Sequence, residues 1–180
     1  MKKLLTTASA ALLLAGIAAQ AQAADGTITF NGNVTASACT PFVAGGTADA
    51  TVKMPMVSAK SLATAGATAG ATQFTIALTG CSGAATQAAA WFESGTNVDP
   101  ATGRLINTGT ATNVDVALYN IGNNTPIAVG QGNGTIGSSG SAVNIANNAA
   151  TLNFNARYYA KGAATAGSVV ATVNYTIQYQ

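Results

Sequence analysis

Hydrophobic and polar residues alternate along much of this chain. Phe74, Ile76 and Leu78 share one face of a run whose other face carries Thr75 and Thr79. The same period of two recurs in three later stretches, residues 114–118, 152–156 and 169–180. Such alternation is typical of antiparallel strands with one buried face, and Gly- and Asn-rich stretches separate the runs. The pattern predicts an all-β chain folded as a β-sandwich.

A further alternating run lies before the first cysteine, at Thr27–Asn31. Ile28, Phe30 and Val34 would share one face, with Gly32 between them. A glycine inside a strand weakens it and often marks a close backbone approach. The run is either the first strand of the sandwich or a detachable strand that fills a groove in another molecule. The pattern by itself favours the first interpretation.

Two stretches are less regular. Residues 58–63 allow a short helical turn, but Gly66 and Gly70 argue against a long helix. Residues 84–90 are rich in alanine and are expected to connect strands. Neither an internal repeat nor a linker between domains is evident, so we expect one domain after any processed segment.

Residues 1–23 are typical of a secretory signal peptide. Lys2 and Lys3 precede an apolar stretch at 10–19, and Ala21-Gln22-Ala23 forms a small-x-small cleavage site. The alternative, an uncleaved membrane anchor, is disfavoured because the apolar stretch is too short to span a bilayer. We therefore expect export, with cleavage between Ala23 and Ala24.

Charge and composition narrow the function. The formal net charge of the 180 residues is +2, but removal of Lys2 and Lys3 leaves five basic against five acidic side chains. A basic surface for nucleic acid is therefore not expected. The chain has no histidine, the commonest general base and metal ligand. We expect no cofactor, no metal and no catalytic activity.

Cys39 and Cys81 are the two cysteines of the sequence. In an exported chain they meet an oxidising compartment, so a disulfide between them is the expected state. Such a bridge would close a loop of about 40 residues, worth roughly 4 kcal/mol in the chain-entropy model. A free reactive thiol is the alternative, but neither cysteine has a histidine neighbour to activate it.

Several motifs along the mature chain resemble the major subunits of chaperone–usher pili of the type 1 kind. They are TITFNGNV followed by SAC, FTIALTGC, ATNVDVALYN, LNFNARYYA and the ending YTIQYQ. The ending has a penultimate tyrosine, Tyr179, and Gly167 stands fourteenth from the end. The motifs are weak singly but specific in this order after a signal peptide, and they favour the detachable-strand interpretation.

The resemblance implies an incomplete immunoglobulin-like β-sandwich that lacks its last strand, formed by residues 39–180. Residues 24–38 would be an N-terminal extension whose donor strand completes the next subunit, an example of strand addition to a sheet edge. The implied donor residues are Gly26, Ile28, Phe30, Gly32 and Val34. The implied residues of the acceptor-groove strand, which a chaperone would also contact, are Gly167, Val173, Tyr175, Ile177, Tyr179 and Gln180.

The same resemblance implies partners and location. The partners would be a periplasmic chaperone, an outer-membrane usher, further copies of this chain and minor pilins. The location would be a cell-surface fimbria that supports adhesion and biofilm formation. The carboxylate of Gln180 would be held by cations of the chaperone.

Other functions remain as alternatives. A minor or adaptor pilin would share the donor strand and the groove, and a secreted β-sandwich binding module would share the fold. A secreted glycosidase would need a carboxylate pair, but no spacing among Glu93, Asp99 and Asp115 selects one. A subunit crosslinked through Lys–Asn bonds could use Lys53, Lys60 or Lys161, with Glu93 assisting.

Overall fold

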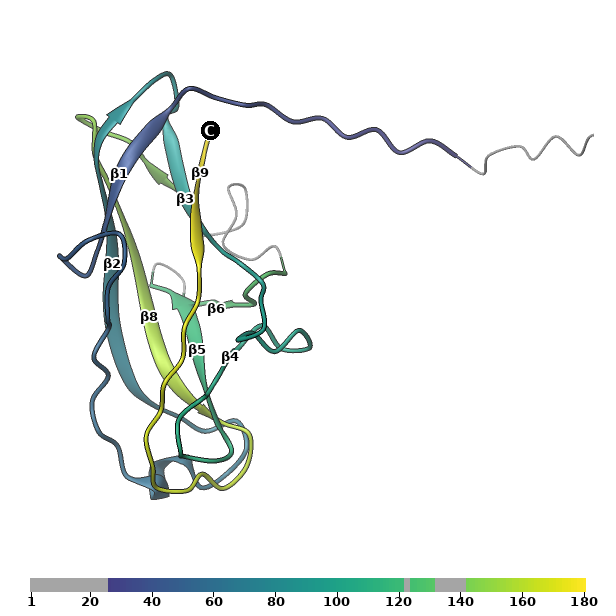
Figure 1. Ribbon diagram of the computed structural model, residues 1–180, viewed down its shortest axis with the longest axis vertical. Helices are drawn as coiled ribbons and strands as arrows, with labels where there is room; N and C mark the ends of the chain where they lie inside the picture. The colour runs from purple at the N-terminus through teal and green to yellow at the C-terminus, as the bar shows by residue number, and fades with distance from the viewer. Residues whose placement is uncertain (1–25, 122–123, 132–141) are drawn as a thin grey trace, which may run out of the picture. The chain divides into compact units, whose positions relative to one another are not determined.

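The computed structural model describes residues 26–121, 124–131 and 142–180 (Figure 1). The predicted signal peptide at 1–23 lies outside the described residues. The chain divides into two units, Met1–Asn33 and Val34–Gln180. Among the described residues, no helix is long and apolar enough to cross a membrane.

The first unit, in its described residues 26–33, contains neither helix nor strand. The expected strand at 27–31 is therefore not formed within the single chain. A strand requires a neighbouring strand to hydrogen-bond with, and no strand in the described part of the chain pairs with this segment.

In its described residues the second unit contains nine strands and one short helix, which confirms the all-β prediction. Its helix η1 spans Ala59–Leu62 and is capped by Ser58, whose side chain accepts a hydrogen bond from the Lys60 amide. The expected helical turn at 58–63 is thus present. The strands are β1 Ala38–Val43, β2 Thr68–Ser82, β3 Gln87–Phe92, β4 Leu105–Ile106, β5 Val114–Asn120, β6 Pro126–Ile127, β7 Val143–Asn144, β8 Ala150–Ala160 and β9 Tyr175–Tyr179.

The strands form two antiparallel sheets. The larger has the order β1-β2-β8-β5-β4, with β6 also paired to β5, and the smaller has the order β7-β3-β9. In Figure 1, the yellow segment that ends in β9 crosses the face of the larger sheet. Within the described residues, β3 is the strand that pairs with β9, so β9 is an edge strand.

The core lies between the two sheets. Phe154 of β8 packs edge-on against Phe92 of β3, with ring centroids 5.0 Å apart. The ring centroid of Phe74 of β2 lies 5.4 Å from that of Phe154. Leu78 and Leu152 are at most 1% exposed. Each fully buried side chain of this size contributes roughly 1.5–3 kcal/mol to stability.

Residues 84–90 do not simply connect strands, because 87–90 form most of β3. Ala88, Ala89 and Ala90 are each at most 1% exposed. Both faces of this strand are covered, so its sequence lacks the alternation that marks a strand with one exposed face.

The expected disulfide is present and joins β1 to β2. Cys39 and Cys81 are bonded, and neither is free. The bridge holds β1 at the edge of the larger sheet, next to the site described below.

Candidate functional site: an open apolar groove

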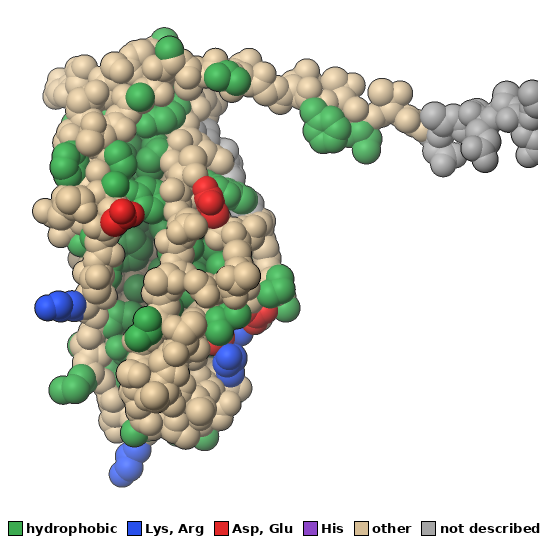
Figure 2. Space-filling view, viewed as in Figure 1, with side chains coloured by type: hydrophobic (Ala, Val, Ile, Leu, Met, Phe, Trp, Pro, Cys, Tyr) green, Lys and Arg blue, Asp and Glu red, His purple; other side chains and the backbone are tan. Residues whose placement is uncertain are grey.

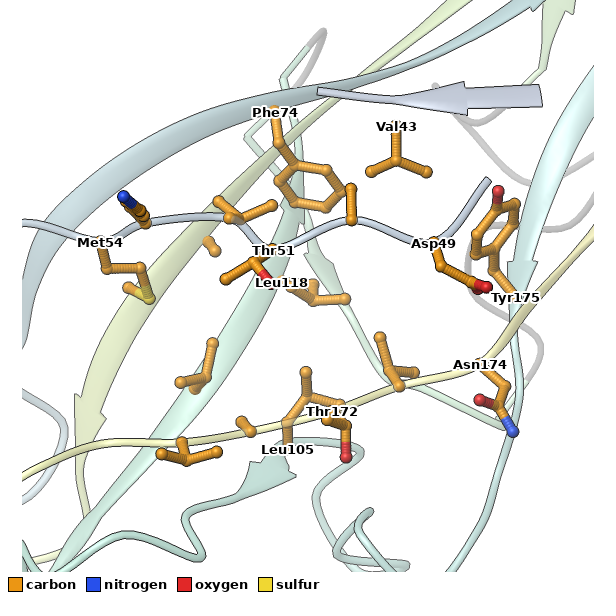
Figure 3. Close-up of a pocket in the computed structure, with 18 of the residues that line it drawn as sticks. Val43, Asp49, Thr51, Met54, Phe74, Leu105, Leu118, Thr172, Asn174 and Tyr175 are labelled. Atoms are coloured by element: carbon orange, nitrogen blue, oxygen red, sulfur yellow. The ribbon is translucent and has the colours of Figure 1, made fainter. Parts of the chain in front are cut away.

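An open groove of about 850 Å³ separates two extended segments of the second unit, residues 48–54 and residues 169–175 (Figure 3). We call these segments the first wall and the second wall. Apart from Tyr175, the first residue of β9, neither wall belongs to a strand. Figure 2 shows hydrophobic side chains exposed along the hollow.

The floor of the groove is apolar and comes from the larger sheet. Successive side chains of a strand point to opposite faces, so one set of alternate residues faces the groove. These floor residues are Phe74 and Ile76 of β2, Leu105 of β4, Val116 and Leu118 of β5, and Ala156 of β8. All of them belong to or pack against the main core cluster. The groove therefore opens directly onto the hydrophobic core.

The backbone of the second wall is bonded on one side only. The Val170 carbonyl accepts a hydrogen bond from the Thr108 amide at 2.8 Å, and the Asn174 carbonyl accepts one from the Glu93 amide at 2.9 Å. In an extended segment, the backbone groups of successive residues point to opposite sides, so those of Ala171 and Val173 point away from Thr108 and Glu93. Among the described residues, Ala171 and Val173 have no backbone hydrogen-bond partner.

The first wall is attached at its two ends. The Tyr175 hydroxyl donates to the Ala48 carbonyl at 3.0 Å, and the Tyr158 hydroxyl donates to the Pro55 carbonyl at 3.2 Å. Between these points, residues 50–54 make no backbone hydrogen bond to the described part of the chain.

Burial affects both tyrosines. It raises the pKa of the Tyr158 hydroxyl above the ordinary value. Burial, followed by the negative charge of Asp49, likewise raises the pKa of Tyr175. Both hydroxyls therefore stay protonated, and able to donate, to a higher pH than usual.

The walls and floor together have the features of a sheet interior that lacks one strand. Two extended segments offer unpaired N–H and C=O groups toward a gap, and the gap is lined with hydrophobic side chains. Unpaired backbone edges of this kind are templates for an added strand. The geometry suits an extended peptide with alternating apolar side chains.

Of the six predicted acceptor-groove residues, Val173 and Tyr175 line the groove. Ile177 and Tyr179 continue along β9 and pack against the core. The Tyr179 hydroxyl accepts a hydrogen bond from the Cys39 amide at 2.8 Å, which connects β9 to β1. The backbone oxygen of Gln180 accepts hydrogen bonds from the amides of two residues, Thr86 at 2.7 Å and Gln87 at 2.9 Å.

Gly167 does not line the groove. A Cβ atom at this position would lie 2.5 Å from the Ala111 backbone nitrogen and 2.8 Å from the Thr110 carbonyl carbon. The glycine is thus required for close backbone packing at the turn that leads into the second wall.

The first wall was not predicted from the sequence. Its signal is short: Val52 and Met54 alternate with Thr51 and Lys53. Both apolar side chains line the groove. In the described structure this segment pairs with no strand. The short alternation over residues 51–54 was therefore the sequence feature that could have indicated a wall of the groove.

The predicted donor side chains are exposed in the part of the first unit that the structure describes. Ile28 is 80% exposed and Phe30 is 89% exposed. A Cβ atom added at Gly26 or Gly32 would meet nothing within 4 Å. Val34, the first residue of the second unit, is also exposed.

The three acidic residues considered for catalysis all have hydrogen-bond or ion-pair partners. Asp115 is buried and forms ion pairs with Lys161 and Arg104. Glu93 accepts a hydrogen bond from the Thr176 hydroxyl. Asp99 is half-buried, and its pKa is lowered mainly by a hydrogen bond from the Thr102 hydroxyl. In the described part of the chain, no three His, Cys, Asp or Glu residues cluster as metal ligands.

Similarity to known proteins agrees with this geometry. The family model for the type-1 fimbrial protein, A (FimA), matches residues 54–180. The F17 fimbrial protein of Escherichia coli is 44% identical over 175 residues, which are 94% of this chain and 95% of that protein. The major fimbrial subunit SMF-1 of Stenotrophomonas maltophilia is 46% identical over 179 residues, 93% of this chain and 99% of that protein.

A solved structure supports the fold separately. The P pilus rod subunit PapA superimposes with a TM-score of 0.59, covering 79% of this chain and 99% of that chain, at 17% sequence identity. At this identity the likeness concerns the fold alone. Taken with the family match and the relatives, it shows that the chain belongs to the type-1 fimbrial protein family and is a structural subunit of surface fimbriae.

Proposed function

We propose that the groove accepts the N-terminal extension, residues 24–38, of another copy of this chain. The observation that carries the proposal is the groove itself, whose apolar floor lies between two unpaired backbone edges. An inserted strand would hydrogen-bond to both walls at the usual spacing of about 4.8 Å. The subunits of the fimbria would then be joined by strand exchange.

The extension has the side chains that such a groove needs. Ile28, Phe30 and Val34 lie at alternate positions and are exposed in the single chain. Burial of Ile28 and Phe30 in a neighbour would contribute roughly 1.5–3 kcal/mol each. Gly26 and Gly32 would fit where the floor approaches the inserted backbone too closely for a side chain.

A subunit with an empty groove needs a partner before assembly. Its exposed core and unpaired edges would otherwise promote aggregation. We assign this role to a periplasmic chaperone that contacts the second wall and β9, with its cations holding the carboxylate of Gln180. An outer-membrane usher then exchanges the chaperone's strand for the extension of the next subunit. In this scheme residues 1–23 are the signal peptide and residues 39–180 the pilin domain.

The contact is head-to-tail, because the N-terminal extension of one copy donates and the groove of another copy accepts. A heterologous contact that does not close into a ring produces a filament. We assign the chain to the shaft of the fimbria, because SMF-1, a relative of similar length, is a major subunit. We assign it no catalytic role.

Substitution in the donor segment tests the proposal. Phe30→Arg places a charge on the apolar face of the extension, whereas Thr29→Arg places the same charge on the opposite face. We expect Phe30→Arg to be exported and bound by the chaperone but to form no fibres in electron micrographs. Thr29→Arg is expected to form fibres. Normal fibres from Phe30→Arg would show that the extension does not fill the groove.

A further inference from the structure

The two methionines that follow the predicted signal peptide occupy contrasting positions. Met54 lines the groove and packs against the core cluster, and Figure 3 shows its sulfur on the groove side of the first wall. Met56, two residues later, is 101% exposed. The chain thus has one thioether inside the acceptor site and a second just outside it.

We propose that Met54 is an oxidation site whose conversion to the sulfoxide blocks the groove. The oxidant belongs to the peroxide class. The sulfur attacks one peroxide oxygen, the O–O bond breaks, an S=O bond forms, and water leaves; the sulfur loses the two electrons that the peroxide gains. The inference rests on the proposed function of the groove as a strand acceptor.

The empty groove gives a small oxidant access to this sulfur. Met54 is only half-buried, and the groove beside it is open. Cys39 and Cys81 are joined in the disulfide, so no free thiol competes for the oxidant. A strand seated in the groove would cover Met54 and leave Met56 exposed. Reactivity at Met54 therefore reports whether the groove is occupied.

The sulfoxide would oppose strand binding for a physical reason. The floor beside the groove is apolar, and an inserted strand would pair with the free backbone groups of the walls. The new S=O oxygen would then be buried without a hydrogen-bond donor. Leaving a buried polar group unpaired weakens binding by about tenfold to a hundredfold.

The experiment uses the exported full chain carrying Phe30→Arg, so that its own extension cannot compete, and a peptide with the unaltered sequence of residues 24–37. Peptide affinity is measured before and after hydrogen peroxide, and mass spectrometry locates the added oxygen of about 16 Da. We expect oxidation at both methionines of the empty chain and a loss of affinity of at least tenfold. When peptide is bound first, Met56 is still oxidised but Met54 is protected.

Two substitutions separate the methionines. Leucine has a similar volume and no oxidisable sulfur. Met54→Leu should keep its peptide affinity after peroxide, whereas Met56→Leu should lose affinity as the parent chain does. Treatment with methionine sulfoxide reductases should restore the parent's affinity.

The failures of the two proposals are distinguishable. If the unoxidised chain does not bind the peptide, the strand-acceptor function is overturned and this inference with it. If the unoxidised chain binds and oxidation at Met54 leaves the affinity unchanged, only the inference about Met54 is overturned. An equal loss of affinity in Met54→Leu would overturn it as well.

Discussion

Asp115 shows how a fully buried position of this subunit tolerates a charge. The side chain has no solvent exposure, and its Oδ1 lies 2.8 Å from the Lys161 amine. Its Oδ2 lies 3.6 Å from Nε of Arg104, whose guanidinium also stacks over the Tyr159 ring at 4.1 Å. A buried carboxylate is costly unless it is paired. The two cations therefore make this position in β5 tenable.

Removal of one cation should destabilise the fold. Lys161→Met keeps the aliphatic chain but leaves the buried Asp115 with the more distant Arg104. The full cost of breaking a buried pair is about 3–5 kcal/mol, and the partial exposure of Lys161 lowers the expected loss to roughly 1–3 kcal/mol. Urea unfolding measures it, with the exposed Lys60→Met as the control. Equal stability of the two variants would contradict a stabilising role for the pair.

Gly167 packs so closely against the backbone that it should not tolerate a methyl group. A methyl group here would press on backbone atoms of residues 110–111, which cannot rotate away as a side chain could. Gly167→Ala should therefore lower stability by about 1–3 kcal/mol, the usual cost of overpacking. Gly95→Ala is the matched control, because a Cβ there meets nothing within 4 Å. A thermal melt compares the two, and an unshifted Gly167→Ala would mean that the turn adjusts freely.

At the scale of elements, the sequence predicted strands best where one face is buried. Residues 152–156 alternate and lie in β8, where Leu152, Phe154 and Ala156 are buried and the two residues between them are not. Residues 114–118 alternate in sequence and lie in β5, although every residue of that strand is buried. β3 was missed because both of its faces are covered by the fold and its alanines carry no alternation. Residues 169–174 were expected to be strand, but they face the gap and lack a strand partner on that side. Pairing is a property of the whole fold, so local sequence cannot reveal it.

The candidate site was likewise predicted only in part from the sequence. Val173 and Tyr175 were predicted through family resemblance, and both line the groove. The first wall was not predicted, because its place opposite the second wall depends on how the chain returns from β1. The floor residues of β2, β5 and β8 were predicted only as strand residues, since nothing in a single strand indicates that its neighbour is missing, and Leu105 of β4 was not predicted at all.

Tyr158 and Tyr175, which hold the first wall, should make the stability of the fold depend on pH. Burial raises the pKa of Tyr158 and Tyr175 above the ordinary 10.0. The folded state therefore retains these protons when the unfolded state has begun to lose them. Their contribution to stability is complete below about pH 10 and is lost as the pH rises through the raised folded-state pKa.

The double variant Tyr158→Phe/Tyr175→Phe cannot titrate at these positions. We expect its urea midpoint to fall less than that of the parent chain between about pH 9 and pH 11. At pH 7 the variant should be somewhat less stable, because it loses the hydrogen bonds to Ala48 and Pro55. Parallel pH profiles for the two proteins would show that these hydroxyls do not titrate with unfolding.

In the whole molecule, donating and accepting a strand are properties of two different segments of the chain. A chain that lacks residues 24–37 keeps the groove but has no strand to donate. A chain with Val173→Arg keeps its extension but has a long charged side chain in the groove. Neither variant should assemble with itself.

A mixture of these two variants should therefore form one interface per pair and stop. The extension of the Val173→Arg chain would enter the groove of the shortened chain, and no further donor would fit. We expect light scattering to show monomers for each variant alone and a one-to-one dimer for the mixture. Adding Phe30→Arg to the Val173→Arg chain should abolish the dimer. Longer oligomers in the mixture would require a second contact between subunits, whereas a dimer alone would make strand donation the link that propagates the fibre.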